Sequence, residues 1–421
     1  MWSRPRSRVS RCCKMRRIRM PLTNFSAYAR SWKIEMKIAW FGHVASARRN
    51  GIVSYSRMML NGLSARGVDV VFFFHATRER HLVTPPNVRA VRIGALDLLN
   101  RATVSSLRAE KTIENVLRHE RPQIAHVSLS FSNLDSSIPE MCHELGIPSV
   151  ATIHTPYGGP GSWWGTAMKV LYRVTVNTFD KYDAAIVFSE NQKRMLEKYG
   201  VEKVALHVIP NGIDVESFAP GEPDYKQELG ARLLISYVGR VDPEKNVGAL
   251  CEAFTGLDLP SDYYLVIAGD GLDYGRLRRK YADDPRIVFR GHISDSRELR
   301  RLLRASDINV LPSSVEGLSI AMLEAMASGA AMVVTDVGSD GEAVRGAGIV
   351  LDLEDLEGQL PLALRSLIEF PEFRQELRRR ARQRAVEQYS LQGNLDKLVQ
   401  LYEELDSRNR SNFYAYRNEI A

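Results

Sequence analysis

The chain has 421 residues, of which 44% are hydrophobic and 25% charged, a composition typical of globular proteins with two or three domains. No apolar run approaches the roughly 18 to 20 residues that a membrane-spanning helix needs. The net charge of +7 comes from residues 1–35, which hold ten Lys or Arg and one acid, whereas residues 36–421 hold 47 bases and 49 acids. This distribution argues against a nucleic-acid-binding protein, which needs a basic face on its folded domains.

The basic segment 1–35 precedes the first predicted element and lacks the sustained apolar core of a secretory signal. Its Arg- and Ser-rich character fits three readings, which the sequence leaves open. The first is that the start codon was mis-called and the protein begins at Met36. The other two are a disordered arm that touches a membrane and an organelle transit peptide.

From residue 36 onward, short apolar runs alternate with longer amphipathic stretches. Runs that are apolar throughout are typical of parallel strands covered on both faces. In the first half, the sequence predicts strands at Lys37–Phe41, Val68–Phe74, Ile124–Leu129, Ser149–Ile153, Ala184–Phe188 and Val204–Ile209, and a helix at Ile52–Ala65.

The pattern restarts after residues 210–229, whose Pro, Gly and Asp content predicts a linker with hinge character. Strands are then predicted at Leu233–Val238, Tyr264–Ala268, Ile287–Phe289, Ile308–Leu311 and Met332–Thr335, and helices at Arg297–Leu303 and Ile320–Ala327. Residues 371–405 hold two helical patterns with no strand between them, which we expect to lie across the domain junction.

Two successive α/β units of similar size predict two Rossmann-like, doubly wound domains that face each other across a cleft. We expect residues 36–209 to form the N-terminal domain and residues 230–387 the C-terminal domain. Residues 388–421 then form a terminal helix that returns to the N-terminal domain, followed by a tail.

The segment Glu316–Glu324 carries two carboxylates eight positions apart, with an apolar helical run between them. On a helix this interval spans about 12 Å, so the carboxylates can accept hydrogen bonds from hydroxyls at both ends of an extended ligand. The amides of Gly317, Leu318 and Ser319 lie where the helix begins, a position that favours phosphate. A solvated surface pair explains the spacing of the carboxylates equally well.

Gly239 and Arg240 directly follow a predicted strand, and Lys245 comes five residues later. Cations at a strand end and in the next loop can converge on a pyrophosphate, although two surface cations are the simpler interpretation. Asn246 is in position to cap the helix that follows.

His154 ends the strand at Ser149–Ile153 and leads into a Gly-rich loop, which places it to line a cleft. The alternative is a histidine that only stabilises the fold. Gly51 opens the helix after the first strand, where a glycine permits close backbone approach, and an ordinary turn is the alternative.

Several motifs of other enzyme classes are missing. The chain has no GxGxxG or P-loop pattern, which disfavours NAD and ATP enzymes. It has no Asp-x-Asp motif and no His/Asp cluster with metal spacing, which disfavours metal-dependent sugar transfer. Its four cysteines form no CxxC pair, which argues against structural zinc and disulfides and fits a reducing cytoplasm.

Together these features resemble the retaining group 1 (family 4) glycosyltransferases of the GT-B fold across roughly residues 36–405. The motifs that carry the resemblance are Pro210-Asn211-Gly212-Ile213-Asp214, Gly239-Arg240 with Glu244-Lys245, Gly269-Asp270-Gly271, Phe289-Arg290-Gly291, Pro312 through Glu324 continuing to Ala327, and Thr335-Asp336-Val337-Gly338 with Glu342. The N-terminal half matches mainly through its first strand, Gly51 and His154.

The resemblance implies a UDP- or GDP-sugar donor held by the C-terminal domain, with the acceptor on the N-terminal side. Arg240 and Lys245 would neutralise the donor pyrophosphate, and Glu316 and His154 would contact the donor sugar. Glu324 would hold the ribose hydroxyls.

The remaining donor-binding positions are also implied by the resemblance. Gly317, Leu318 and Ser319 would supply backbone amides to the sugar and phosphate. The base would stack near residues 289–291, which places Arg290 at the donor together with Gly239, and Gly51 would approach the phosphate or the acceptor.

Enzymes of this kind retain the anomeric configuration without a metal or other cofactor, and the departing phosphate takes the acceptor's proton. The resemblance implies a glycan, lipid-linked or small-molecule acceptor, in cell-surface polysaccharide or glycolipid synthesis. We expect a cytoplasmic enzyme, peripheral at the inner face of the membrane, where Trp163 and Trp164 beside Lys169 and Arg173 are candidates for lipid contact. The alternatives are a UDP-sugar 2-epimerase of the same fold and a non-catalytic subunit that binds sugar nucleotides.

Overall fold

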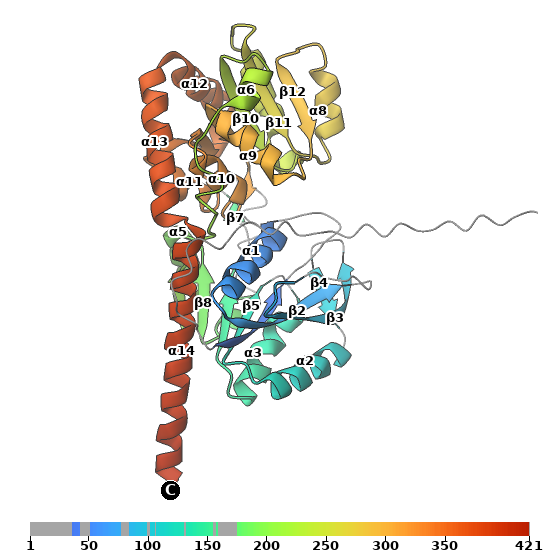
Figure 1. Ribbon diagram of the computed structural model, residues 1–421, viewed down its shortest axis with the longest axis vertical. Helices are drawn as coiled ribbons and strands as arrows, with labels where there is room; N and C mark the ends of the chain where they lie inside the picture. Colours follow the sequence, from blue (N-terminus) through green and yellow to red (C-terminus); the bar gives the residue numbers. More distant parts are fainter. Residues whose placement is uncertain are drawn as a thin grey trace, which may run out of the picture.

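The structure is a computed structural model that describes residues 36–42, 51–76, 84–98, 102–105, 107–129, 132–154, 157–158 and 175–420. It shows two α/β domains and two successive C-terminal helices, of which α13 (Pro371–Gln388) lies along the C-terminal domain and α14 (Leu391–Ile420) along the N-terminal domain (Figure 1). The basic segment 1–35 and the two tryptophans predicted to touch lipid, Trp163 and Trp164, lie outside the described residues.

The N-terminal domain is built on a sheet of strand order β4-β3-β2-β1-β5-β6-β8-β9 in the described chain. Its strands are β1 (Lys37–Gly42), β2 (Asp69–Ala76), β3 (Val88–Leu98), β4 (Ala102–Ser105), β5 (Ile124–Ser128), β6 (Ser149–Thr152), β8 (Ala184–Val187) and β9 (Ala205–Val208). Neighbouring strands are parallel except β3 and β4, and Ile38 of β1 pairs with both Val70 and Ile124. As the apolar runs predicted, this sheet is covered on both faces.

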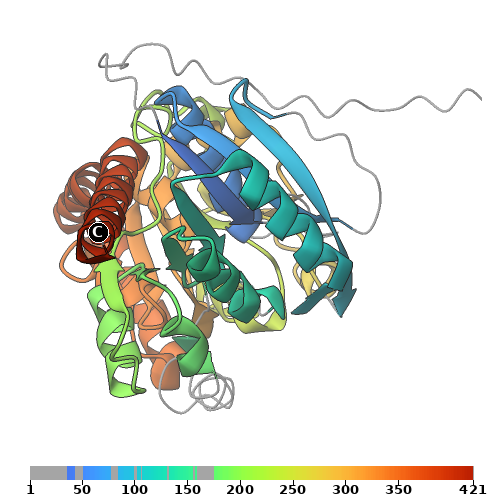
Figure 2. The same cartoon turned by 90° about the horizontal axis from the view of Figure 1, so that it is seen from below.

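Helices supply those two covers (Figure 2). They are α1 (Gly51–Ala65), α2 (Leu107–Glu120), α3 (Leu134–Glu144) and α5 (Glu190–Lys198). Trp40 and Phe72 pack on the same side as α1, whereas Phe41 and Phe73, their neighbours in sequence, pack on the side of α2 and α3. This alternation follows from the period of two along a strand.

The C-terminal domain has a parallel sheet of order β12-β11-β10-β13-β15-β16. Its strands are β10 (Leu233–Val238), β11 (Tyr263–Ala268), β12 (Ile287–Gly291), β13 (Ile308–Leu311), β15 (Ala331–Thr335) and β16 (Gly348–Leu351). Its helices are α6 (Asp224–Glu228), η1 (Pro243–Lys245), α7 (Val247–Thr255), α8 (Tyr274–Lys280), α9 (Ser296–Ala305), α10 (Ile320–Ala327), α11 (Asp340–Val344), η2 (Leu353–Asp355), α12 (Leu356–Glu369) and α13 (Pro371–Gln388). The prediction of two doubly wound domains is confirmed.

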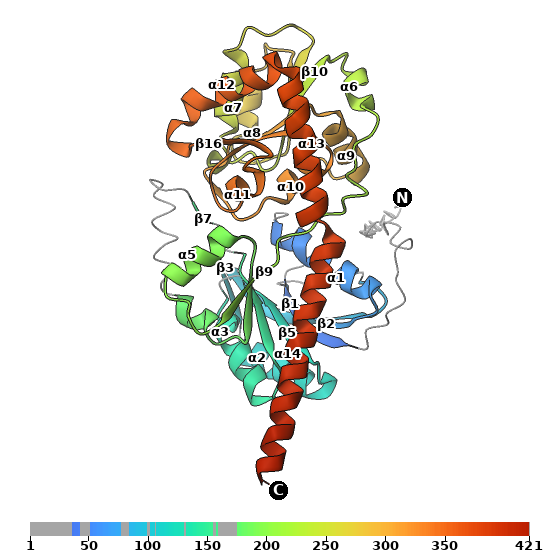
Figure 3. The same ribbon diagram turned by 90° about the vertical axis from the view of Figure 1, so that its left-hand side faces the viewer.

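In the part of the chain that the structure describes, two segments cross between the domains, and they are bonded to each other. Helix α13 packs on α10 and β15, and α14 (Leu391–Ile420) then packs on α1 and β5 of the other domain (Figure 3). Between these helices, the Ile213 amide donates to the Tyr389 carbonyl, and the Leu391 amide donates to the Ile213 carbonyl, each over 2.8 Å. A Cβ on Gly212 would lie 2.5 Å from Leu391 Cα, so the close crossing needs a glycine there.

A buried polar network anchors α14 in the N-terminal domain. Tyr402 Oη lies 2.6 Å from His126 Nδ1, and His126 Nε2 lies 2.7 Å from Thr152 Oγ1. The His126 ring stacks on Trp40, with the ring centroids 4.0 Å apart. Burial, with a smaller effect of the charge of His154, lowers the pKa of His126 to about 3, so the imidazole is neutral and bridges two hydroxyls.

Helix α13 is rich in arginine because its side chains bind the carbonyl ends of three other helices. Arg382 donates to Ala327 O at the end of α10 over 3.0 Å, and Arg384 donates to Ala343 O in α11 over 3.1 Å. Arg374 donates to the Leu367 carbonyl of α12. Cations are favoured at helix C-termini, so this helix stabilises the C-terminal domain.

Candidate active site

Three glycines bring the carboxyl ends of β10, β11 and β12 close together. The Gly239 amide donates to Ala268 O over 3.0 Å, and the Gly269 amide donates to Gly291 O over 2.8 Å. A Cβ on Gly269, where φ is +156°, would lie 1.7 Å from Gly239 O, so no larger residue fits. The predicted site residue Gly239 therefore lies at the edge where parallel sheets bind ligands.

Lys245, predicted to neutralise the donor pyrophosphate, and Glu316, predicted to bind the donor sugar, are in direct contact. Lys245 Nζ lies 2.5 Å from Glu316 Oε1 and 3.4 Å from the Val315 carbonyl oxygen. Ser313 Oγ donates to the same carboxylate oxygen over 3.1 Å. Because Ser314 also bonds to the Glu244 carbonyl, the turn that carries Lys245 is attached to the strand that carries Glu316.

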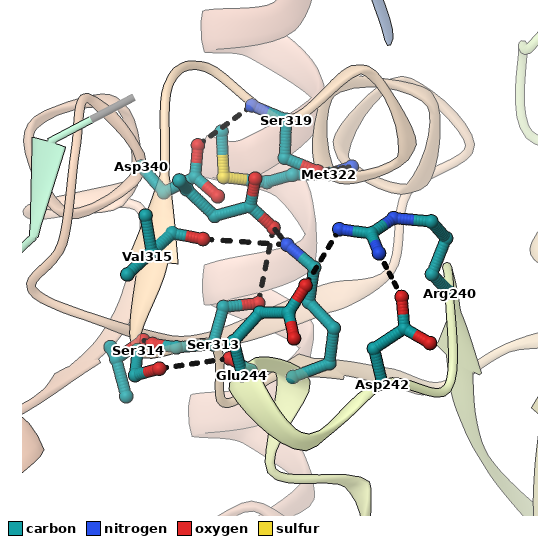
Figure 4. Close-up of polar contacts among 12 residues, drawn as sticks. Arg240, Asp242, Glu244, Ser313, Ser314, Val315, Ser319, Met322 and Asp340 are labelled. Atoms are coloured by element: carbon teal, nitrogen blue, oxygen red, sulfur yellow. Dashed lines mark hydrogen bonds and ion pairs between the residues drawn. The ribbon is translucent and has the colours of Figure 1, made fainter. Parts of the chain in front are cut away.

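Arg240 is held by two carboxylates (Figure 4). One guanidinium nitrogen bonds to Asp242, and another lies 2.8 Å from Glu244 Oε1. Asp242 is almost fully buried and also accepts from the Leu272 amide over 2.8 Å, which connects the loops after β10 and β11. Asp242 was not singled out from the sequence, although its place in the turn between Arg240 and Lys245 was a usable signal.

The turn before α10 is bonded on both sides. Ser319 caps α10, its Oγ accepting from the Met322 amide over 3.3 Å. The Leu318 carbonyl accepts from Asn211 over 3.0 Å. The Ser319 amide, which was predicted to bind the donor sugar or phosphate, donates to Asp340 Oδ1 over 2.8 Å. It therefore already has an acceptor within the protein.

Asp340 is a buried carboxyl group on the short helix α11 that the sequence analysis did not single out. Burial and then the charge of Glu316 raise its pKa well above the usual range, against the opposite effects of the Ser319 amide and Lys245. Two carboxyl groups and one lysine thus form the centre of the site.

Glu324 lies on α10, but Glu316 does not, because Glu316 belongs to the two-residue strand β14 (Val315–Glu316) and the helix begins at Ile320. The helical spacing of about 12 Å assumed for this pair is therefore wrong. Burial raises the pKa of Glu324 to about 7, against the smaller effects of Arg57 and Arg300.

His154 comes from the other domain and lies beside the same turn. Its ring contacts Tyr55 edge-on, with centroids 4.6 Å apart, and Phe188 at 5.2 Å. A Cβ on Gly317 would lie 3.6 Å from the His154 carbonyl oxygen. Strand β7 (Tyr157–Gly158) then pairs with β14, so the two domains meet directly at Glu316.

Two predicted donor-binding residues are not brought into this cluster. Arg290 bonds to Glu298 over 2.9 Å and lies over the Tyr225 ring, and no contact in the described chain joins it to Arg240 or Lys245. Gly51 is the first residue of α1, and residues 43–50 before it lie outside the described chain. Asn246 occupies the N-cap position of α7, but its side chain donates to Pro312 O, so the predicted side-chain cap is wrong.

Neither a metal cluster nor a membrane span is found in the described residues. No three His, Cys, Asp or Glu side chains in this part of the chain gather as they would around a metal ion. None of the helices that it contains is both long and apolar enough to cross a membrane.

Sequence comparisons match the two halves of the chain separately. Residues 49–217 match the family model Glycosyltransferase Family 4, and residues 232–369 match Glycosyl transferases group 1. The chain is 25% identical over 321 residues to an Escherichia coli UDP-Gal:alpha-D-GlcNAc-diphosphoundecaprenol alpha-1,3-galactosyltransferase, covering 72% of this chain and 81% of that protein. It is 28% identical over 265 residues to a GDP-mannose-dependent alpha-mannosyltransferase of Mycolicibacterium smegmatis, covering 60% and 67%.

Solved structures match over most of the chain. Sucrose-phosphate synthase from Thermosynechococcus elongatus superposes with a TM-score of 0.70 at 18% identity, over 89% of this chain and 100% of that one. Anabaena HepE in complex with UDP-glucose gives a TM-score of 0.68 at 16% identity, over 88% and 100%. The chain belongs to the group 1 (family 4) glycosyltransferases of the GT-B fold, enzymes that take a sugar from a nucleotide sugar.

Proposed function

We propose that this enzyme is a metal-independent, retaining hexosyltransferase that moves a sugar from a UDP-sugar to a lipid-linked glycan acceptor. The observation that carries the proposal is the contact of Lys245 with Glu316 next to the Arg240 turn, with His154 of the other domain beside Gly317. This arrangement offers a cation for a diphosphate and a carboxylate for sugar hydroxyls within one site.

The choice of UDP rests on relatives from two comparisons. The Escherichia coli relative is named for UDP-Gal, and the HepE structure contains UDP-glucose. The mannosyltransferase relative is named for GDP-mannose, which makes GDP the second candidate nucleotide.

In the proposed reaction, the bond between the anomeric carbon and the diphosphate oxygen breaks, and the acceptor oxygen bonds to that carbon from the same face. The acceptor's proton passes to the departing diphosphate. Arg240 and Lys245 offset the charge that develops on the leaving group, which is the largest catalytic contribution expected where no nucleophilic side chain takes part. Glu316 orients the sugar, and Glu324 accepts from the ribose hydroxyls.

The acceptor is proposed from the Escherichia coli relative, which the match covers over 81% of its length. That protein is named for a diphosphoundecaprenol-linked GlcNAc acceptor, a lipid-linked sugar. We therefore place the reaction in cell-surface polysaccharide or glycolipid synthesis, in the cytoplasm at the inner face of the membrane.

A binding screen tests the donor assignment. Melting temperatures are measured with UDP and with GDP, in EDTA and with added Mg²⁺. Ligand at about 100 times its dissociation constant stabilises a protein by about 2.7 kcal/mol, so UDP should raise the melting temperature equally in both buffers. Stabilisation by GDP alone, or only with Mg²⁺, would overturn the donor or the metal-independent mechanism.

A second assay separates the alternatives within the same fold. The enzyme is incubated with UDP-GlcNAc alone and the sugar is followed by NMR. Formation of the 2-epimer would identify an epimerase. Binding of UDP-sugars without turnover, with any acceptor tried, would support the non-catalytic subunit.

A further inference from the structure

The segment Gly338–Glu342 lies against the turn that precedes α10. The Ser339 amide donates to the Gly317 carbonyl over 2.6 Å, and Asp340 Oδ1 accepts from the Ser319 amide over 2.8 Å. Gly338 has a φ of +58°, and a Cβ there would lie 2.2 Å from the Glu316 carbonyl oxygen. The backbone from Glu316 to Ser319 therefore packs against this segment and is hydrogen-bonded to it.

The same segment reaches across to the N-terminal domain. The half-buried Glu342 accepts from the first amides of α5, with Oε1 at 3.1 Å from Glu190 N and Oε2 at 2.8 Å from Asn191 N. Ser339 Oγ lies 2.8 Å from Ser189 Oγ, and both residues are buried. A carboxylate is favoured at a helix N-terminus, where the amides lack partners within the helix.

The same five residues make both sets of contacts. The bonds of Glu342 to α5 exist only while the domains lie together, because they join residues of different domains. When the domains separate, Glu342 and the α5 amides return to water, and the segment keeps only its bonds to the turn. Five consecutive residues thus connect the position of one domain to the backbone that follows Glu316.

We propose that Glu342 is a positioning residue that couples domain closure to the order of the donor-binding turn. By binding α5, it holds the Gly338–Glu342 segment in place and so fixes the Glu316–Ser319 backbone for the donor. Glu342 itself touches no substrate in this scheme. The coupling rests on the proposed donor function, whereas the domain contact does not.

The test uses the full chain and three variants. Glu342→Ala removes both acceptors, and Glu342→Gln keeps one acceptor without the charge. Glu357→Gln is the matched control, because Glu357 is exposed on α12 and makes no contact with the N-terminal domain among the described residues. Affinity for UDP is measured by calorimetry, and the radius of gyration by small-angle scattering with and without UDP.

We expect UDP binding about tenfold weaker in Glu342→Ala, the loss expected for about one charge-assisted hydrogen bond. Its radius of gyration without UDP should exceed that of the wild type, Glu342→Gln should be intermediate, and Glu357→Gln should match the wild type. If Glu342→Ala keeps the wild-type radius and UDP affinity, the inference is wrong, even if its melting temperature falls. If the wild type does not bind UDP, the proposed donor is wrong. In that case an unchanged radius of gyration in Glu342→Ala still shows that Glu342 does not hold the domains together.

Discussion

Lys245 Nζ lies 2.5 Å from Glu316 Oε1, and the two side chains are only 11% and 18% exposed. The contact joins the turn after β10 to the strand β14 that pairs across the domain interface. Each charge is compensated by the other in a partly buried site, so either residue alone would be left with an unpaired charge.

Removing both members of the pair should cost less stability than removing one. Lys245→Met leaves Glu316 beside Asp340 without a cation, and we expect a loss of about 2–3 kcal/mol, less than for a fully buried pair. Lys245→Met combined with Glu316→Gln should regain most of this loss in urea unfolding, while sugar transfer stays absent. A double variant as unstable as Lys245→Met would show that the contact does not set the stability.

The proposed role of Arg240 at the donor diphosphate makes Glu244 a competitor, since Glu244 already binds the guanidinium over 2.8 Å. Glu244→Gln should therefore bind UDP more tightly, by roughly three- to tenfold at low salt, because one opposing charge is lost. The gain should shrink as salt rises. Glu252→Gln, an exposed acid paired with Lys280, is the control. Weaker UDP binding in Glu244→Gln would mean that Glu244 orients Arg240 instead of competing for it.

Glu324 should make the protein less stable as the pH rises. Its pKa is about 7 in the folded state and near 4.5 otherwise, so the folded state binds more protons between these values. The free energy of unfolding then falls with pH across this window. Glu324→Gln should melt higher than the wild type at pH 8, yet bind UDP more weakly because a carboxylate acceptor for ribose is lost. Equal melting temperatures of the wild type and Glu324→Gln at pH 8 would show that the charged Glu324 carboxylate does not destabilise the folded state.

Tyr402→Phe should loosen α14 from the N-terminal domain. His126 Nδ1 loses its partner in a buried site, and we expect a loss of about 1–2 kcal/mol. UDP affinity should stay unchanged, since the residues proposed to bind the diphosphate and the ribose, Arg240, Lys245 and Glu324, belong to the C-terminal domain. Hydrogen exchange along α14 measures the effect, and unchanged protection there would show that the network does not anchor the helix.

The sequence predicted the central strands of both sheets because they are buried on both faces and read as continuous apolar runs. It missed β3, where Arg89 and Arg92 interrupt the apolar pattern, and β16 at the edge of the second sheet. It also missed β7 and β14, since two-residue strands that pair across domains leave no periodic signal. Apolar runs therefore predicted strands even at sheet edges, as for β9 and β12, whereas interrupted runs and two-residue pairings were missed.

At the site, the motifs that resemble the family singled out Arg240, Lys245, Glu316 and His154, and the structure places Lys245 against Glu316 and His154 beside Gly317. Their roles at the donor remain predictions. The sequence could not show that Asp340 accepts from the Ser319 amide or that Glu342 binds α5, because these bonds join segments that only the fold brings together. Only the folded structure therefore shows which of the predicted site residues already have hydrogen-bond partners within the protein.

The proposed transferase activity is measured as transfer from UDP-sugars to a synthetic GlcNAc-diphosphate-lipid acceptor in EDTA, with the anomeric configuration of the product determined by NMR. UDP-galactose and UDP-glucose are offered separately, to the wild type and to Glu316→Gln. We expect an α-linked product from the wild type and a rate about 10²–10³ lower in Glu316→Gln. A β-linked product, turnover that stops in EDTA, or an unchanged rate in Glu316→Gln would contradict it.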